Sequence, residues 1–146
     1  MKMEVKELTT EEDVRSAFPI MNELRTHLTE EDYECLVLEA MTKDRYQMFA
    51  LFVEDEIVAV TGFKPMITLY YGRYVWICDL VTSSDQRSKG YGEKLISHVE
   101  RWAADQGYGS VALSSGLSRT EAHRFYEEKM DYDKVSYVFR KTWGST

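Results

Sequence analysis

The chain has 146 residues, of which 44% are apolar, and both values suit a single globular domain. Aromatic residues make up 13% of the chain, which argues against intrinsic disorder. With 25 acidic and 18 basic residues the net charge is −7, and this excludes a broad basic surface of the kind that binds nucleic acid.

The N-terminal part predicts one edge strand followed by helices. Residues 3–8 are expected to form the strand, and Thr10, followed by three acids, is a typical first residue of a helix. Pro19 lacks a backbone N–H, so this helix is expected to kink or restart near it. Thr29 is expected to cap a second helix over 30–42, whose many acids most simply form a solvated face.

The middle of the chain predicts antiparallel strands. Apolar runs at 46–53 and 57–63 flank an acidic turn, and Pro65 is expected to end or bend the second of them. A turn at 70–73 then leads into 74–82, a β-branched and aromatic run typical of a central strand.

The remaining elements are a helix from 91 that ends at Gly107, a short strand at 110–114, a helix at 119–129 and a closing strand at 132–141. The expected order is βααβββαβαβ. We therefore predict an α/β (α+β) fold in one domain, 1–146. It should contain a mixed central sheet of about six to seven strands flanked by about four helices.

Two cysteines and the absence of a leader bear on location. Cys35 and Cys78 lie in apolar runs without a metal-binding or redox spacing, so free thiols in a reducing compartment are expected. The charged N-terminus lacks the apolar segment of a signal peptide, and no apolar run approaches the roughly 18 residues that span a bilayer. We expect a cytoplasmic protein without a membrane partner.

A loop between the 74–82 strand and the 91–103 helix is suited to an anion. Glycines at 90 and 92 allow close backbone approach, the helix start offers unpaired N–H groups, and Arg87 and Lys89 add charge. The G-x-G letters alone are weak, because Gly107 and Gly109 repeat them at the end of a helix. The position between strand and helix is what predicts a ligand with a diphosphate or a similar group.

Two stretches resemble one family. Arg87-x-x-Gly90-x-Gly92 after a hydrophobic strand resembles the acyl-CoA diphosphate motif of the GNAT superfamily of N-acetyltransferases, and the stretch 122–132 is similar to that family's A-x-x-F-Y-E-K-x-G-F/Y. The resemblance implies the family's fold and acetyl-CoA as co-substrate. It implies coenzyme contacts at Leu80, Val81, Thr82, Arg87, Ser88, Lys89, Gly90, Tyr91, Gly92, Glu93 and Arg119.

The resemblance also implies two catalytic residues. Tyr126 is expected to protonate the leaving thiolate, and Asp79 to help deprotonate the amine. Diamine and polyamine acetyltransferases have a Glu where this chain has Cys78, which puts polyamine specificity in doubt. Asp79 as base, as substrate anchor and as structural partner all stay open. Cys78 is a poor candidate for an acyl-carrying nucleophile, because the adjacent carboxylate raises a thiol pKa.

We therefore expect direct acetyl transfer from acetyl-CoA to a primary amine of a small molecule or a protein. The alternative is a non-catalytic acyl-CoA-binding sensor or regulatory module. A homodimer is a family-level expectation, and no metal is predicted because the three histidines are isolated. Tyr70, Tyr71, Tyr74 and Trp76 could cage a cationic amine, although cross-strand packing is the simpler interpretation.

Overall fold

A computed structural model describes residues 2–144 of the chain. The chain divides into two compact units, residues 1–113 and 114–146. The first unit contains β1 (Met3–Leu8), α1 (Glu11–Ser16), α2 (Phe18–Met21), α3 (Glu30–Lys43), β2 (Gln47–Val53), β3 (Glu56–Thr68), β4 (Gly72–Thr82), a 3-10 turn (Ser84–Gln86), α4 (Tyr91–Asp105) and β5 (Val111–Leu113). The second contains α5 (Thr120–Arg124) and a π-helical turn (Phe125–Lys129).

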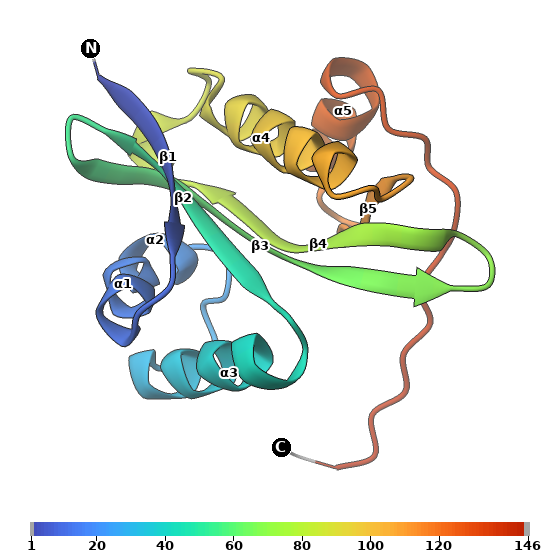
Figure 1. The fold of residues 1–146 in the computed structure, drawn as a ribbon, viewed down its shortest axis with the longest axis horizontal. Helices are drawn as coiled ribbons and strands as arrows, with labels where there is room; N and C mark the ends of the chain where they lie inside the picture. Colours follow the sequence, from blue (N-terminus) through green and yellow to red (C-terminus); the bar gives the residue numbers. More distant parts are fainter. Residues whose placement is uncertain (1, 145–146) are drawn as a thin grey trace. The chain divides into compact units, whose positions relative to one another are not determined.

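One mixed sheet of five strands, ordered β1-β2-β3-β4-β5, forms the centre of the first unit. Neighbouring strands from β1 to β4 are antiparallel, whereas β4 and β5 are parallel. The α/β class is confirmed, although the sheet has fewer strands than the six to seven expected. Figure 1 shows α1, α2 and α3 on one face of this sheet and α4 on the other.

The helices before β2 begin where local chemistry predicts them. Thr10 caps α1 in a capping box with Asp13, and Thr29 caps α3 by accepting a hydrogen bond from the N–H of Asp32. Pro19 lies in the first turn of α2, where its missing N–H leaves no acceptor unpaired. The expected restart is therefore confirmed as a break between α1 and α2, which raises the number of helices to five in the described residues.

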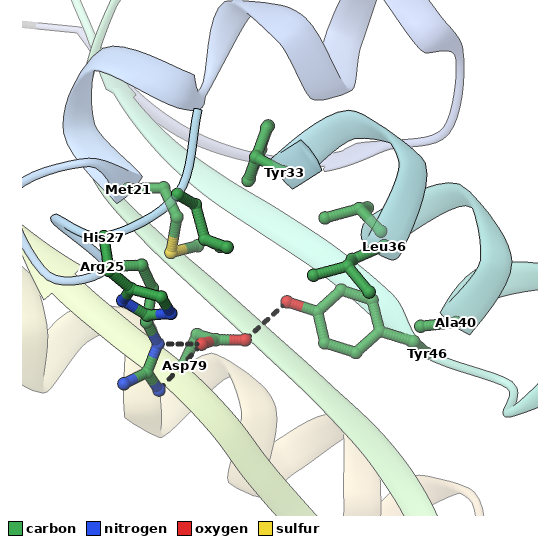
Figure 2. Close-up of a pocket in the computed structure, with 10 residues that line it drawn as sticks. Met21, Arg25, His27, Tyr33, Leu36, Ala40, Tyr46 and Asp79 are labelled. Atoms are coloured by element: carbon green, nitrogen blue, oxygen red, sulfur yellow. Dashed lines mark hydrogen bonds and ion pairs between the residues drawn. The ribbon is translucent and has the colours of Figure 1, made fainter. Parts of the chain in front are cut away.

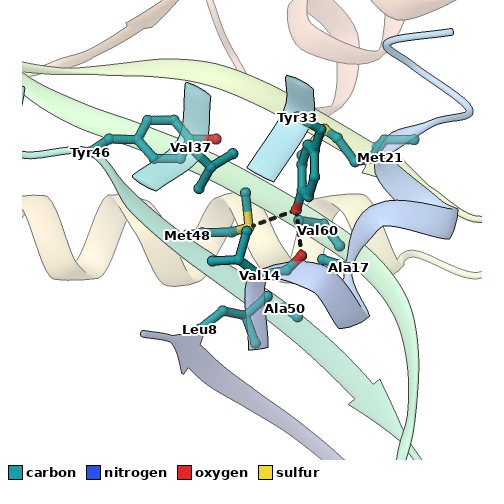
Figure 3. Close-up of a cluster of buried hydrophobic side chains, with 11 residues drawn as sticks. Leu8, Val14, Ala17, Met21, Tyr33, Val37, Tyr46, Met48, Ala50 and Val60 are labelled. Carbon is teal, nitrogen blue, oxygen red and sulfur yellow. Dashed lines mark hydrogen bonds between the residues drawn. The ribbon is translucent and has the colours of Figure 1, made fainter. Parts of the chain in front are cut away.

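The face covered by α1, α2 and α3 holds a continuous buried cluster (Figure 3). Tyr33 of α3 lies at its centre, and its hydroxyl donates a 2.8 Å hydrogen bond to the Val14 carbonyl of α1 and contacts the Met48 sulfur of β2. Val14 and Met48 are fully buried. This contact holds α3 against both α1 and the sheet, and α3 will form one wall of the site described below.

The opposite face packs against α4. Leu95, Ile96 and Val99 of α4 are fully buried, and the ring of Trp102 meets the ring of Phe63 of β3 at a centroid distance of 5.0 Å. Gly107, with φ +87°, ends this helix as expected.

Pro65 does not end β3, because the strand continues to Thr68 in register with β4. The β2 pairing stops at Phe63, so β3 has an edge on that side from there onward. A proline fits in a strand where its missing N–H faces an edge and not a partner strand.

In the second unit, the expected closing strand at 132–141 is also absent: residues 131–143 have no regular secondary structure. Their alternating apolar side chains stay exposed, with Phe139 at 93% and Tyr137 at 71%. The β propensity of such a segment acts only when a neighbouring strand and a buried face are present. Asp131 adopts the left-handed conformation, with φ +63°, which aspartate tolerates better than most residues.

Candidate functional site

A β-bulge in β4 sets the direction of two chemically important side chains. Gly62 pairs with Asp79 and Phe63 with Ile77, so Cys78 is the extra residue. Side chains normally alternate between the two faces of a strand. Here Cys78 packs against the buried cluster on the α1–α3 face, and Asp79 lines a cavity on that same face. The bulge therefore brings two consecutive side chains to one side.

Beyond the bulge, β4 has an open edge. β5 pairs only with Val75–Ile77, so within residues 2–113 no strand lies beside Cys78–Thr82 on that side. We call this segment the open edge of β4. It contains Leu80, Val81 and Thr82, three of the residues expected to contact the coenzyme. Open backbone groups on a strand edge can hydrogen-bond an extended ligand.

The open edge leads into a loop, 83–90, that the rest of the unit holds in place. The Ser84 N–H donates a 2.8 Å hydrogen bond to Glu23, and the Ser83 hydroxyl donates one of 2.6 Å to Asp85. Ser88 and Gly90 both have positive φ, +67° and +80°. Arg87 and Lys89 are exposed, so their charges are available to a ligand.

At the end of this loop α4 begins without a cap. The first hydrogen bond of the helix joins the Lys94 N–H to the Gly90 carbonyl, and no side chain caps the turn before it. The N–H groups of Tyr91, Gly92 and Glu93 therefore have no acceptor within the helix. Uncapped N–H groups and the partial positive charge of a helix start suit an anion.

A cavity of about 400 Å³ adjoins this turn. Four residues expected to contact the coenzyme line it, namely Lys89, Gly90, Tyr91 and Glu93, and Lys94 and Arg101 contribute two further cations. The sequence prediction did not include these two, although their spacing from Gly90 along the helix places them near the same helix face.

On the other face of the sheet, Asp79 has two partners that the sequence did not identify. Its Oδ1 accepts a 2.9 Å hydrogen bond from Arg25 Nε, and Arg25 Nη2 donates to the Cys78 carbonyl, also at 2.9 Å. Its Oδ2 accepts a 2.7 Å hydrogen bond from the Tyr46 hydroxyl. Figure 2 shows the carboxylate between these two side chains. The Asp79 carbonyl also accepts a hydrogen bond from Thr61.

Burial near this carboxylate changes the acidity of its neighbours. Burial, and then the negative charge of Asp79, hold the pKa of Tyr46 well above its ordinary value. The same two causes, in the same order, raise the pKa of the Cys78 thiol to about 11. The thiol is therefore protonated at neutral pH, as expected from its place beside Asp79, and unsuited to carrying an acyl group.

Asp79, Arg25 and Tyr46 line a second cavity of about 400 Å³, which we call the α2–α3 pocket. Its other walls come from α2, the segment that follows α2, and one face of α3 (Figure 2). Tyr33, Leu36, Val37 and Ala40 repeat at the spacing that places side chains on a single helix face. A volume near 400 Å³ lies at the lower end of the roughly 300–1,000 Å³ usual for small-molecule sites.

Two predicted site residues lie in the second unit. Arg119 precedes α5 at its N-cap position and is exposed, and Tyr126 lies in the π-helical turn with its ring against Phe125 and Tyr132. Burial raises the pKa of Tyr126, partly offset by the charge of Arg119. A phenol with a raised pKa stays protonated through neutral pH.

Linear patterns could not have identified Arg25 and Tyr46. Arg25 stands 54 positions before Asp79 and Tyr46 stands 33 positions before it. The available signal was Asp79 itself, because a carboxylate on an apolar strand needs a partner when it is buried. That argument predicts the existence of a donor but not its position.

The aromatic residues near the turn between β3 and β4 pack on one another. Tyr71 packs edge-to-face on both Tyr70 and Tyr74, and none of these rings lines the α2–α3 pocket.

Over residues 2–144, no group of three or more His, Cys, Asp and Glu side chains is placed to hold a metal ion. None of the helices in that range combines the length and the apolar character needed to cross a membrane.

Comparison with known proteins matches residues 8–132 to the Acetyltransferase (GNAT) family. An uncharacterized N-acetyltransferase of Bacillus subtilis (strain 168), YhdJ, is 44% identical over 137 residues, covering 94% of this chain and 96% of the relative. Aminoglycoside N-acetyltransferase AAC(6')-Iy in complex with CoA has a TM-score of 0.85 at 12% identity, covering 97% of this chain and 95% of that one. Aminoglycoside acetyltransferase meta-AAC0020, from an uncultured soil metagenomic sample and in complex with sisomicin, has a TM-score of 0.80 at 16% identity, with 97% of each chain covered. The two solved structures share this chain's fold.

Proposed function

Because this chain belongs to the GNAT family of acetyltransferases, we propose that it transfers an acetyl group from acetyl-CoA to a primary amine of a small molecule or a protein. The observation that carries the proposal is the continuity of β4. The strand's open edge, Cys78–Thr82, runs through the loop into the uncapped start of α4. Asp79 of the same strand faces the α2–α3 pocket, so one strand serves both a coenzyme and an acceptor.

The residues around the loop fit the coenzyme chemically. Uncapped N–H groups at the start of α4, with Arg87 and Lys89 beside them, suit a diphosphate, and Leu80–Thr82 offer backbone groups to a pantetheine arm. Arg119 is proposed to add charge. The CoA bound to the fold-related AAC(6')-Iy supports this assignment. Bound acetyl-CoA would supply the acetyl thioester.

The acceptor amine needs to lose a proton before it can attack. An amine with an ordinary pKa near 10.4 is neutral in only about one molecule in 2,500 at pH 7. Asp79 is proposed to accept a proton from the amine nitrogen, directly or through water, as that nitrogen bonds to the acetyl carbon and the carbon–sulfur bond breaks. Tyr126 is proposed to donate its proton to the departing sulfur, a role that comes from the family resemblance.

An assay of amines with acetyl-CoA, following the release of free thiol, tests the function. We expect release with at least one amine, and calorimetry should detect CoA binding. Exchange of Arg87 and Lys89 for Gln should weaken CoA binding by about tenfold for each cation lost. Lys43→Gln is the control, because it removes one charge from the exposed end of α3 on the opposite face.

Two outcomes would change the assignment. CoA binding without thiol release on any amine would indicate the alternative, a non-catalytic acyl-CoA sensor. Unaltered CoA affinity in the Arg87 and Lys89 variants would remove the loop from the coenzyme site.

A homodimer and a cytoplasmic location are further proposals. The first comes from the family, and light scattering after size exclusion tests it. The second is supported by the free thiols of Cys35 and Cys78, and microscopy of the tagged protein in its host tests it.

A further inference from the structure

The walls of the α2–α3 pocket are mainly apolar. Met21, Leu28, Leu36, Val37 and Ala40 surround it, together with the rings of two tyrosines, and the exposed His27 also lines it. Tyr33 contributes no free hydroxyl, because that group already donates to the Val14 carbonyl in the core. At the roughly 30 Å³ that a water molecule occupies, a cavity of about 400 Å³ holds on the order of a dozen non-hydrogen atoms.

The one acid and the one arginine that line the pocket pair with each other. Asp79 is the one acid among the described residues that line it, and Arg25 lies 2.9 Å from it as its ion-pair partner. A carboxylate has about four acceptor positions, two on each oxygen. Arg25 Nε takes one position on Oδ1 and the Tyr46 hydroxyl takes one position on Oδ2, so a position on Oδ2 remains open to a ligand. The Asp79 side chain keeps 17% of its surface exposed, so this position can be reached.

The acids of α3 do not add a second carboxylate to this pocket. Glu34 pairs with Arg15 at 3.1 Å and Glu39 with Lys43 at 3.4 Å, and neither lines the pocket. Asp44, at the end of α3, pairs with Lys64. The acidic character of this helix therefore belongs to its outer faces, while the face toward the pocket is apolar.

From this arrangement we propose that the acceptor is a small primary monoamine with an apolar alkyl or aryl body. The inference rests on the proposed function and names its substrate class. The amine nitrogen binds at the free position of Asp79 Oδ2, and the apolar body lies along Leu36, Val37 and Ala40. Burial of apolar surface then supplies the affinity, and the Asp79 carboxylate fixes the orientation.

A polycation fits this pocket poorly. A second ammonium would lie among apolar side chains with no carboxylate to accept its protons, and an unpaired charge in such surroundings is strongly unfavourable. Aminoglycoside acetyltransferase meta-AAC0020, which has this fold, offers a contrast, because the sisomicin bound to it carries several amines. We expect this chain to discriminate against such ligands.

Hexylamine and 1,6-diaminohexane form a matched pair of probes, because they share a six-carbon chain and differ by one amine. We expect kcat/KM for acetyl transfer to favour hexylamine by at least about tenfold. In the presence of CoA, titration followed by NMR should show the same preference in binding, without requiring turnover.

Leu36→Glu tests whether the pocket causes the preference. Leu36 lines the pocket and is 55% exposed, so a carboxylate can be added there without disturbing the core. The variant should reduce the preference for hexylamine by about fivefold, because the second ammonium gains a partner. Cys35→Glu is the matched control: it adds the same charge to the preceding residue of α3, which is exposed and does not line the pocket.

Each result decides the proposal. Equal or better use of the diamine, a response to Cys35→Glu as large as that to Leu36→Glu, or transfer to peptide N-termini but not to hexylamine would overturn it. Preferential binding of hexylamine without acetyl transfer would uphold the pocket's ligand class while removing the proposed function. If neither amine binds, the ligand class is wrong, whatever the enzyme does with other acceptors.

Discussion

The hydroxyl of Tyr46 occupies the space in which a side chain on Gly62 would begin. A Cβ atom at Gly62 would overlap the Tyr46 oxygen and the ring carbon that bears it. Gly62 is also the residue of β3 that pairs with Asp79 at the bulge. The absence of a side chain at this position therefore allows the Tyr46 ring to cross the strand and donate its hydrogen bond to Asp79.

Gly62→Ala should consequently displace Tyr46. We expect a loss of about 1–3 kcal/mol in the free energy of unfolding, measured with urea, since both the added methyl group and the buried ring must shift. Acetyl transfer should fall as well, because Asp79 loses a donor. Gly109→Ala is the control: its Cβ would meet only the Arg73 carbonyl at 3.7 Å, an ordinary contact. Equal unfolding curves for the two variants would contradict this account of Gly62.

Cys78 should be unreactive in the folded protein. With a pKa of about 11, only about one thiol in a thousand is ionised at pH 8. Iodoacetamide at that pH should modify the exposed Cys35 and leave Cys78 unmodified until the chain is denatured, as peptide mass spectrometry can establish.

Because the thiol carries no acyl group in our proposal, Cys78→Ala should keep acetyl transfer within about threefold of the wild type. Cys35→Ala serves as the reference for handling and purity. Loss of transfer in Cys78→Ala alone, without a loss of folded protein, would revive a covalent intermediate.

Alkaline pH should lower the free energy of unfolding through three buried groups. The pKa values of Tyr33, Tyr46 and Cys78 are all raised in the folded state, chiefly by burial. Above the ordinary pKa values, 9.0 for cysteine and 10.0 for tyrosine, the unfolded chain therefore binds fewer protons than the folded chain. Below pH 9 these groups contribute their full stabilisation. As the pH rises further, the free energy of unfolding falls by at most about 1.4 kcal/mol per pH unit for each group.

Urea unfolding between pH 8 and 10.5, with a reductant present, measures this decline. Cys78→Ala should flatten the part that begins near pH 9, and Tyr46→Phe the part above pH 10. The exposed Cys35 provides the comparison, since Cys35→Ala should leave the slope unchanged. A stability that stays constant up to pH 10.5 would show that these groups are not buried as described.

Tyr126→Phe should lower kcat by roughly tenfold to a thousandfold if Tyr126 is the acid, with little change in CoA affinity. Its raised pKa keeps the phenol protonated through neutral pH, so the wild-type rate should decline only at alkaline pH, and this decline should be missing in the variant. Tyr137→Phe is the matched control, because Tyr137 is 71% exposed. Unchanged kcat in Tyr126→Phe would end the assignment.

Local chemistry was sufficient for much of the fold and for the geometry of the loop before α4. The caps at Thr10 and Thr29, the break at Pro19 and the left-handed Asp131 all follow from interactions within a few residues. The loop before α4 is of the same kind, because a strand, small residues, cations and a helix start stand in sequence within it. Its role with the coenzyme remains a prediction.

Tertiary structure decided the rest. The apolar pattern of 132–141 predicts a strand that does not form, and β3 continues past Pro65, where an end or a bend was expected. In both cases the outcome depends on whether a neighbouring strand pairs with the segment. The bulge at Cys78 exists only in the register between β3 and β4. Arg25 and Tyr46 reach Asp79 across 54 and 33 positions, so the α2–α3 pocket and the ion pair in it arise when the chain folds back on itself. Sequence periodicity reports which residues share a face, whereas the contacts between faces depend on packing over long distances in the chain.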